Sequence, residues 1–259
     1  MDLGIKGKKA IICASSKGLG KACALSLTKE GVLVTINGRN QSNIDLAIEE
    51  IFQLTGVRIQ GVAADIRTED GRASLLQSCP EADILVTNNE GPKPGNFQDW
   101  GRDEYIEAFD ANMLGPVLMI RGVLPGMRQR RFGRIINITS AMVKSPLAHQ
   151  GLSTAARTAL TAVCKAISRD VAQDNVTINN LLPERIDTGR QIQMTERQAK
   201  IDNITFAQAR KNIELTIAAK RFGTTEEFGD ICAYLCSKQA SFISGQNIQV
   251  DGGSYRGIV

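Results

Sequence analysis

The N-terminal part of the chain carries the motif Cys13-Ala14-Ser15-Ser16-Lys17-Gly18-Leu19-Gly20, at the end of the apolar run Lys9–Cys13. Glycines before a helix let the backbone approach a phosphate closely, and the helix N-terminus offers it unpaired N–H groups. Two glycines alone are a weak indication, because a tight turn before any helix can use them. Their position after the first expected strand is more informative, and it predicts a phosphate-binding site here.

Short apolar runs and amphipathic segments alternate from this turn to the C-terminus. Leu19, Cys23 and Leu27 recur at four-residue spacing, which indicates a helix that ends at Gly31. A second helix from about residue 44 is expected to end at Gly56. By the same criteria we expect strands near 9–13, 32–37, 58–63, 84–87, 134–138, 177–182 and 247–250, and further helices near 103–130, 154–171 and 226–236. This alternation favours an α/β fold with a parallel sheet covered on both faces.

The expected elements form one uninterrupted series. No linker, repeat or low-complexity stretch divides it, so residues 1–259 are predicted to form a single domain. The polar segment near 189–220 contains no expected strand. We expect it to form a small helical lid over the open end of the sheet, where α/β proteins bind their ligands.

The composition excludes several classes of protein. With 42% hydrophobic and 22% charged residues the chain is typical of globular domains, and no apolar stretch approaches the roughly 20 residues of a transmembrane helix. The N-terminus is polar and lacks the apolar core of a signal peptide, so we expect a cytoplasmic protein without a membrane partner. Aromatic residues do not interleave with the basic ones, so no nucleic-acid partner is expected.

The cysteines and a cluster of arginines are the remaining groups that could form special sites. The six cysteines form no Cys-x-x-Cys pair and fall mostly in apolar segments, so we interpret them as reduced core residues. Cys232 and Cys236 share a helix face, but no histidine lies near them, and no metal site is expected. Arg128, Arg130, Arg131 and Arg134 form a basic cluster that fits either a helix C-terminus or a docking patch for an acidic partner.

Several motifs, taken together with the glycine turn, resemble those of the short-chain dehydrogenase/reductase family. The turn is similar to the family signature Thr-Gly-x-x-x-Gly-x-Gly, with Ala14 at the first glycine. The other matching segments follow in the family's order: Asn88-Asn89-Glu90, Asp110-Ala111-Asn112, Ile136–Ser140, Asn180–Thr188 and Val250–Gly253. Glu90 and Glu184 stand where the family usually has glycine. The resemblance covers nearly the whole chain and implies a Rossmann-type doubly wound sheet and a homodimer or homotetramer.

The resemblance also implies a nicotinamide dinucleotide. A carboxylate on the ribose typifies sites for NAD, whereas cations hold the 2′-phosphate of NADP. The second strand leads to Arg39 without an acid, and Lys17 lies in the turn, so we expect NADP(H), with NAD as the alternative. If Glu90 and Glu184 point inward, they weaken its binding. The other cofactor contacts that the resemblance implies are Ser15, Ser16, Gly18, Leu19, Gly20, Asp65, Ile66, Asn88, Arg157, Pro183, Ile186 and Thr188.

The catalytic centre departs from the family pattern. Members carry Tyr-x-x-x-Lys thirteen residues after the catalytic serine, and counting from Ser140 gives Ser153 and Arg157 instead. Hydride delivery to a ketone creates an alkoxide that needs a proton from a positioned acid, and a serine hydroxyl is a weaker and shorter donor than a phenol. Arg157 can still bond the ribose hydroxyls, but it cannot relay a proton as lysine can.

Candidate replacements for the acid follow from this difference. A water held by Ser153 is one, and His149 in the loop between Ser140 and Ser153 is another, because imidazole exchanges protons near neutral pH. Lys144 in the same loop is a weaker candidate. By resemblance Ser140 would polarise the substrate oxygen and Asn112 would hold a structural water.

Three hypotheses for the function are compatible with these residues. The first is an NADP(H)-linked oxidoreductase acting on a small-molecule carbonyl or alcohol. Because the resemblance is strongest to 3-oxoacyl-carrier-protein reductases, the substrate could be a carrier-bound acyl chain, with the arginine cluster as the docking patch. The second is an inactive family member that senses a dinucleotide or pairs with an active subunit. The third is different chemistry on this fold, such as dehydration or epimerisation.

Overall fold

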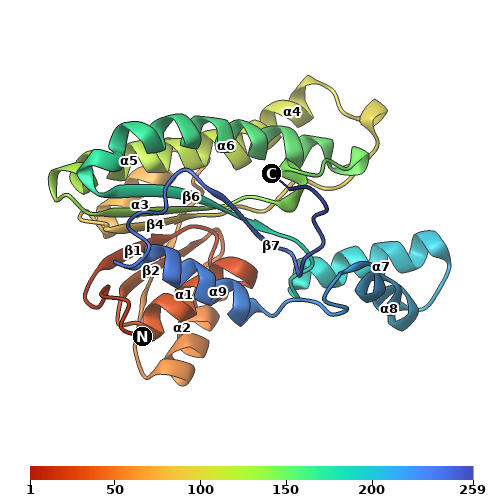
Figure 1. Cartoon of the computed structure of the whole chain (residues 1–259), viewed down its shortest axis with the longest axis horizontal. Helices are drawn as coiled ribbons and strands as arrows, with labels where there is room; N and C mark the ends of the chain where they lie inside the picture. The colour runs from red at the N-terminus through yellow and green to blue at the C-terminus, as the bar shows by residue number, and fades with distance from the viewer. Residues whose placement is uncertain (259) are drawn as a thin grey trace.

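The expected strands assemble into one parallel sheet in the computed structural model, which describes residues 1–258 (Figure 1). Within this range seven strands stand in the order β3-β2-β1-β4-β5-β6-β7, and every neighbouring pair is parallel. Each lies within a residue or two of its expected position. Their bounds are β1 Lys9–Ile12, β2 Leu33–Gly38, β3 Gln60–Ala63, β4 Ile84–Thr87, β5 Gly133–Ile138, β6 Val176–Pro183 and β7 Asn247–Val250.

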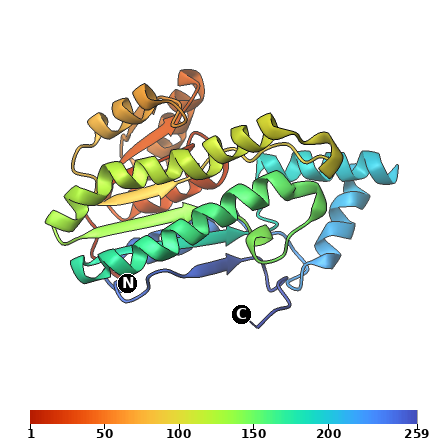
Figure 2. The ribbon, with the colours of Figure 1, turned by 90° about the horizontal axis from the view of Figure 1, so that it is seen from above.

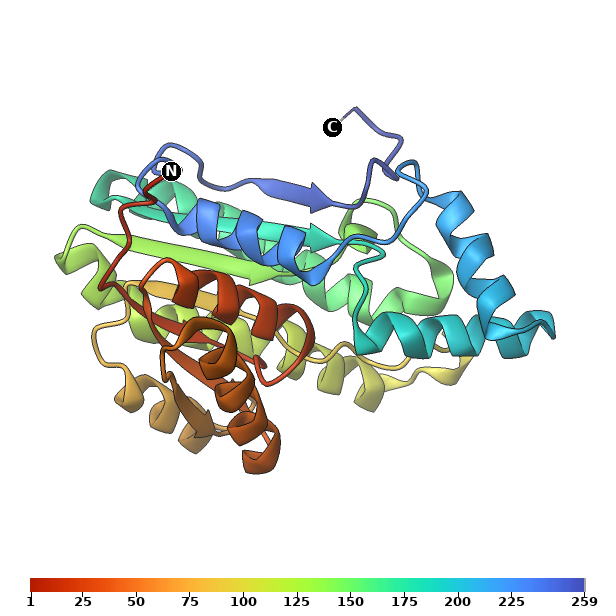
Figure 3. The same cartoon turned by 90° about the horizontal axis from the view of Figure 1, so that it is seen from below.

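Helices cover both faces of the sheet, as the alternating pattern predicts. Figure 3 shows α1 (Gly18–Lys29), α2 (Gln41–Thr55) and α9 (Thr225–Cys236) on one face. On the other face lie α3 (Glu69–Ser78), α5 (Gly115–Gln129) and α6 (Gly151–Val171), with α4 (Arg102–Phe109) beside the end of α6 (Figure 2). The fold class expected from the sequence is therefore confirmed: a doubly wound α/β sheet.

The core divides into two apolar layers because successive strand residues point to opposite faces. In β1, Ala10 and Ile12 belong to the layer under α1 and α9, whereas Ile11 belongs to the layer under α5 and α6. In β5, Ile136 and Ile135 divide in the same way. Both faces of the strands are buried, so the sequence reads as short continuous apolar runs.

The ends of the helices follow ordinary capping chemistry. Gly56 ends α2 in the left-handed conformation, with φ of 71°. At the start of α9 the Thr224 hydroxyl accepts from the Glu227 N–H at 3.1 Å, and the Glu227 carboxylate accepts from the Thr224 N–H at 2.8 Å. This capping box fixes where α9 begins.

Two helices extend beyond the carboxyl ends of the strands (Figures 1 and 2). These are α7 (Gly189–Asp202) and α8 (Phe206–Thr216), which pack against each other in the segment expected to be a lid. An isolated bridge between Ile186 and Gly223 closes the base of this excursion. The helical content is as predicted, and the movement of the segment as a lid stays a prediction.

Two observations complete the fold. All six cysteines are buried and unbridged, as expected of core residues. Among the described residues, no helix has both the length and the apolar composition needed to cross a bilayer.

Candidate active site

The order of the strands locates the site. The chain runs outward from β1 to β3 and then returns to β4 beside β1, so a crevice opens at the carboxyl ends of β1 and β4. A cavity of about 700 Å³ lies there, bounded on its far side by α7 and α8. Segments from all of β1, β4, β5 and β6 reach it, which explains how motifs that are distant in sequence meet.

The turn after β1 has the backbone that its glycines predict. Ala14 lies at φ 45°, in the left-handed region, although it carries a side chain. Its N–H donates to the Asn37 Oδ1 at 3.3 Å, and its carbonyl accepts from the Asn88 Nδ2 at 3.1 Å. A Cβ on Gly20 would lie 2.5 Å from the Ala14 carbonyl oxygen, so only glycine fits there. Asn88 therefore fastens the turn to β4.

The start of α1 is open to an anion. Lys17 is the N-cap, and no side chain accepts from the first N–H groups of the helix. Lys17, Gly18 and Leu19 line the cavity. Ser15, in contrast, is fully buried, and its hydroxyl donates to the Ile12 carbonyl at 2.6 Å. Its side chain shapes the turn rather than facing the cavity.

Arg39 and Glu90 pair across the mouth of this crevice. The Arg39 Nη2 lies 2.8 Å from the Glu90 Oε2, with both side chains about 60% exposed. Glu90 thus lines the cavity but has its charge partner on the other side of the opening. The sequence left open where Glu90 points, and this contact places its carboxylate on the guanidinium expected to meet a 2′-phosphate.

The other residues expected near the adenine lie outside the cavity lining. Asp65 follows β3, and its carboxylate accepts three hydrogen bonds from the Arg67 guanidinium at 2.6 to 3.1 Å. This contact with Arg67 lowers the pKa of Asp65. Ile66 is buried in the core, and Ser16 and Gly20 also do not line the cavity.

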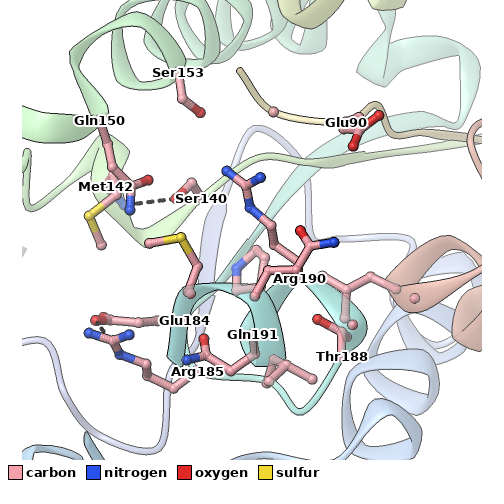
Figure 4. Close-up of a pocket in the computed structure, with 18 of the residues that line it drawn as sticks. Glu90, Ser140, Met142, Gln150, Ser153, Glu184, Arg185, Thr188, Arg190 and Gln191 are labelled. Atoms are coloured by element: carbon pink, nitrogen blue, oxygen red, sulfur yellow. Dashed lines mark hydrogen bonds and ion pairs between the residues drawn. The ribbon is translucent and has the colours of Figure 1, made fainter. Parts of the chain in front are cut away.

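Ser140, Ser153 and Arg157 line the same cavity, and Figure 4 shows Ser140 and Ser153 on its wall. Ser140 follows β5 and accepts from the Met142 N–H at 3.2 Å. Ser153 and Arg157 lie one turn apart on α6, and the Arg157 Nε donates to the Ser153 Oγ at 3.2 Å. A guanidinium has no acceptor, so the Ser153 hydroxyl must direct its own hydrogen elsewhere.

The Arg157 guanidinium holds neighbouring backbone segments together through hydrogen bonds, in addition to carrying a positive charge. Its Nη1 donates to the carbonyls of Ile138 at 2.6 Å and Thr139 at 3.1 Å, and its Nη2 donates to the carbonyl of Asn89 at 3.3 Å. The side chain is 8% exposed. Burial, with a smaller contribution from the charge of Arg190, lowers the pKa of Arg157 to about 10. Arg157 remains charged at neutral pH and joins the ends of β4 and β5 to α6.

Asn112 occupies a π-helical segment, Asp110–Leu114, between α4 and α5. It is 3% exposed, and its Oδ1 has no hydrogen-bond partner. A buried acceptor of this kind fits the expected role of holding a water. The carbonyl of neighbouring Ala111 accepts from the Asn89 Nδ2 at 2.6 Å, so the π-helical segment is tied to the end of β4.

The candidate proton donors are placed as follows. His149 lines the cavity, and its carbonyl accepts from the Gly95 N–H at 3.1 Å. Lys144 lies outside the lining, with its Nζ 5.2 Å from the centre of the Tyr255 ring. Within the described chain no tyrosine lines the cavity, because Tyr105 packs against the start of α6 and Tyr234 is exposed on α9.

The segment after β6 contributes the opposite wall. Pro183, Ile186 and Thr188, which were expected to contact the cofactor, line the cavity. Glu184 is partly buried and lies 3.9 Å from the Arg185 Nε. Burial raises the pKa of Glu184, an effect that the charge of Arg185 reduces and that of Asp251 increases.

Sequence reasoning did not identify the lining residues of α7 as functional. Arg190 extends from the first turn of α7 toward the space between Ser140, Ser153 and Glu90 (Figure 4). Met142, Gln191 and Met194 also line the cavity. The one available signal was the position of Arg190, two residues beyond the expected cofactor contact Thr188.

The arginine cluster lies elsewhere. It stands before and at the amino end of β5, whereas Ser140 follows its carboxyl end. Arg128 donates to Asp174 at 2.7 Å, and Arg134 is buried with a donation to the Asn175 carbonyl at 2.9 Å. Arg128 is in the last turn of α5. We therefore favour the helix-terminus interpretation over docking of an acidic carrier protein.

Comparison with known proteins finds similarity to reductases in sequence and in structure. Residues 13–255 match the family model described as Enoyl-(Acyl carrier protein) reductase. The NADPH-dependent reductase BacG of Bacillus subtilis is 32% identical over 97% of this chain and 99% of its own. The crystal structure of YwfH, described as an NADPH-dependent reductase involved in bacilysin biosynthesis, has a TM-score of 0.92 at 32% identity, covering 98% of this chain and 100% of its own. L-sorbose reductase from Gluconobacter frateurii, solved with NADPH and L-sorbose, has a TM-score of 0.93 at 28% identity over the whole of both chains.

Proposed function

Since this chain belongs to the short-chain dehydrogenase/reductase family, we propose that it is an NADP(H)-linked oxidoreductase that transfers hydride between the nicotinamide and a small carbonyl or alcohol substrate. One observation carries the proposal: a single cavity is lined by the phosphate turn after β1, by Ser140, and by the Ser153–Arg157 pair. A phosphate site and a polar reaction centre in one crevice fit a cofactor that reaches from one to the other. The NADPH-dependent relatives support this choice of cofactor.

The residues of the turn fit a dinucleotide. The open N-terminus of α1 and the Lys17 ammonium would hold its phosphates. Arg39 would take the 2′-phosphate once it leaves Glu90, and Thr188 and Ile186 would contact the nicotinamide end. The buried Arg157 guanidinium makes four donations to Ser153 and the backbone, so its fifth N–H would serve the ribose.

The proton step is assigned to Ser153. When bound, the cofactor supplies hydride to the carbonyl carbon, and the carbonyl oxygen must then gain a proton to give the alcohol. Ser140 donates to that oxygen and polarises it. Ser153 accepts from Arg157, so its hydroxyl hydrogen points away from the guanidinium and can hold a water that donates to the developing alkoxide. The hydroxide left behind would regain its proton from solvent. His149, which lines the same cavity, is the alternative donor.

The first experiment is a thermal shift series with NADPH and NADH, followed by NADPH oxidation with a panel of ketones. We expect stabilisation by NADPH, and stabilisation by neither dinucleotide would overturn the proposal. Ser153→Ala should lower kcat while leaving the dissociation constant of NADPH unchanged, and His149→Gln should change kcat little. The reverse outcome would assign the proton step to His149.

An inactive dinucleotide-binding member is the second candidate. The observation that favours it is the pairing of the Arg157 guanidinium with three backbone carbonyls, which is a structural use of a catalytic position. Ser153→Tyr restores a phenol while keeping the hydrogen bonds from Arg157 to the three backbone carbonyls. Ketone reduction that appears only in Ser153→Tyr would identify the natural protein as inactive. Reduction by the parent enzyme would exclude this candidate.

A further inference from the structure

The first turn of α7 carries a positively charged residue, Arg190, that lines the cavity and, among the described residues, has no acidic partner. Arg190 points from α7 toward Ser140 and Ser153 (Figure 4), and its Nη2 donates to the Pro92 carbonyl at 3.2 Å. Arg190 is exposed to solvent in the open cavity, and the neutral Pro92 carbonyl does not neutralise its positive charge. Within residues 1–258 Arg190 forms no ion pair, whereas Arg185, which also lines the cavity, pairs with Glu184. Arg39 pairs with the lining residue Glu90.

Three acids line the cavity, and none of them forms an ion pair with Arg190 in the described part of the chain: Asp202, at the end of α7, accepts from the Gln198 Nε2 at 2.7 Å. Glu90 is held 2.8 Å from Arg39, and Glu184 turns toward Arg185. A second cation lies in the same lining: burial lowers the pKa of Arg157, and the charge of Arg190 lowers it further. Two guanidinium groups therefore face the position of the substrate without an anion between them.

The helix itself adds donors. Thr188 is the N-cap of the 14-residue α7, and its side chain makes no capping hydrogen bond, so the first N–H groups of α7 carry unsatisfied positive character toward the cavity. Gln191 is 8% exposed and lines the cavity, and its Nε2 has no hydrogen-bond partner. A buried unpaired donor is costly unless a ligand completes it. The helix N-terminus favours a negatively charged group, and the Gln191 amide favours a hydrogen-bond acceptor.

From this arrangement we propose that Arg190 is a specificity-determining residue that binds a carboxylate of the substrate, so that the enzyme acts on oxo acids rather than on neutral ketones. The inference rests on the proposed oxidoreductase function and names its substrate class. The carboxylate would lie between Arg190 and the reaction centre, with the ketone oxygen at Ser140 and Ser153. The apolar side chains of Met142, Met194 and Ile213 in the lining would receive the remainder of the substrate.

The test measures binding, so it does not depend on turnover. We would titrate 2-oxo-4-phenylbutanoate and its neutral ethyl ester into the full chain, with and without saturating NADP⁺. The parent protein should bind the acid at least about 10-fold more tightly than the ester, as expected for a hydrogen-bonded charge pair. In Arg190→Gln the two ligands should bind with similar affinity. Equal binding of acid and ester by the parent, or no binding of either, would overturn the inference.

Control variants separate the alternatives. Arg197→Gln removes the same charge from the exposed face of the same helix and should keep the preference for the acid. Arg190→Lys should retain part of the preference, and melting curves of each variant verify that it folds. If Arg190→Gln instead weakens NADP⁺ binding and keeps the acid-to-ester ratio, Arg190 holds cofactor phosphate and the inference is wrong. Failure of the parent to bind NADP⁺ would contradict the proposed function alone, because the acid-to-ester ratio is also read without cofactor.

Discussion

Glu90 should act as an internal competitor of the cofactor phosphate. The Glu90→Gln substitution removes its charge while keeping its size and most of its hydrogen-bonding capacity. In the parent protein the carboxylate holds Arg39 at 2.8 Å, so a 2′-phosphate that takes Arg39 must first displace it. We therefore expect Glu90→Gln to bind NADPH more tightly than the parent protein does.

The size of the effect follows from the exposure of the pair. Arg39 and Glu90 are 59% and 63% exposed, and an ion pair this open contributes about 1 kcal/mol or less. A loss of about 1 kcal/mol corresponds to roughly a fivefold change in the dissociation constant. The expected gain in NADPH affinity is therefore roughly two- to fivefold at low ionic strength. It should diminish as added salt screens the charges.

The assay is calorimetric titration of NADPH and NADH into parent, Glu90→Gln, Arg39→Gln and the double variant. NADH has no 2′-phosphate, so its affinity should not change in Glu90→Gln. Arg39→Gln should weaken NADPH binding. In the double variant, Glu90→Gln should no longer increase the affinity for NADPH, and the double-mutant cycle measures this loss. Glu49→Gln on α2 removes a comparable exposed ion pair with Arg58, which follows the helix, and serves as the control. Tighter NADH binding, or a benefit that persists without Arg39, would refute the competition.

Three further predictions concern stability and reactivity. Gly20→Ala should lower the melting temperature by roughly 2–10 °C, because its Cβ would lie 2.5 Å from the Ala14 carbonyl oxygen at a cost of about 1–3 kcal/mol. Gly189→Ala is the control: a Cβ there would have no atom within 4 Å, so the melting temperature should not fall. Thiol titration near neutral pH should detect no cysteine in the native protein and six after denaturation, because all six are buried and burial raises the pKa of Cys13 to about 12. Glu184→Gln should be more stable than the parent at neutral pH in denaturant titrations. Burial raises the folded-state pKa of Glu184, so its destabilising effect appears as pH rises above about 4 and should be absent below it; an advantage that instead grows in acid would contradict this assignment.

The sheet was predictable from the sequence because its strands are buried on both faces. Short apolar runs such as Ile84–Thr87 indicate buried strands when amphipathic helical segments separate them. The helix α3 was not expected, since within Glu69–Ser78 only Leu75 is buried and no apolar stripe forms. Its one local signal is the N-cap Thr68, which accepts from the Gly71 N–H at 3.1 Å.

The placement of a candidate site residue was predictable wherever that residue follows a strand. Ser140 and Asn88 follow parallel strands, so the topology alone brings them to one edge. Pairings that depend on side-chain direction were not predictable: Arg39 meets Glu90 across 51 residues of sequence, and the direction of Arg190 depends on how α7 leaves β6. Ser15 lies in the expected motif, but its side chain is buried and accepts from the Asn37 N–H of β2 at 2.9 Å instead of facing the cavity.

The hydrogen bonds of Arg157 restrict which substitutions this protein can accept at that position. Arginine makes four donations there, to three carbonyls and one hydroxyl, whereas an ammonium group has three hydrogens and no planar fork. Replacing it by the lysine typical of the family would leave at least one of these acceptors without a donor. A change to the family's usual Tyr-x-x-x-Lys pair would therefore need another donor for the acceptor that lysine leaves unsatisfied.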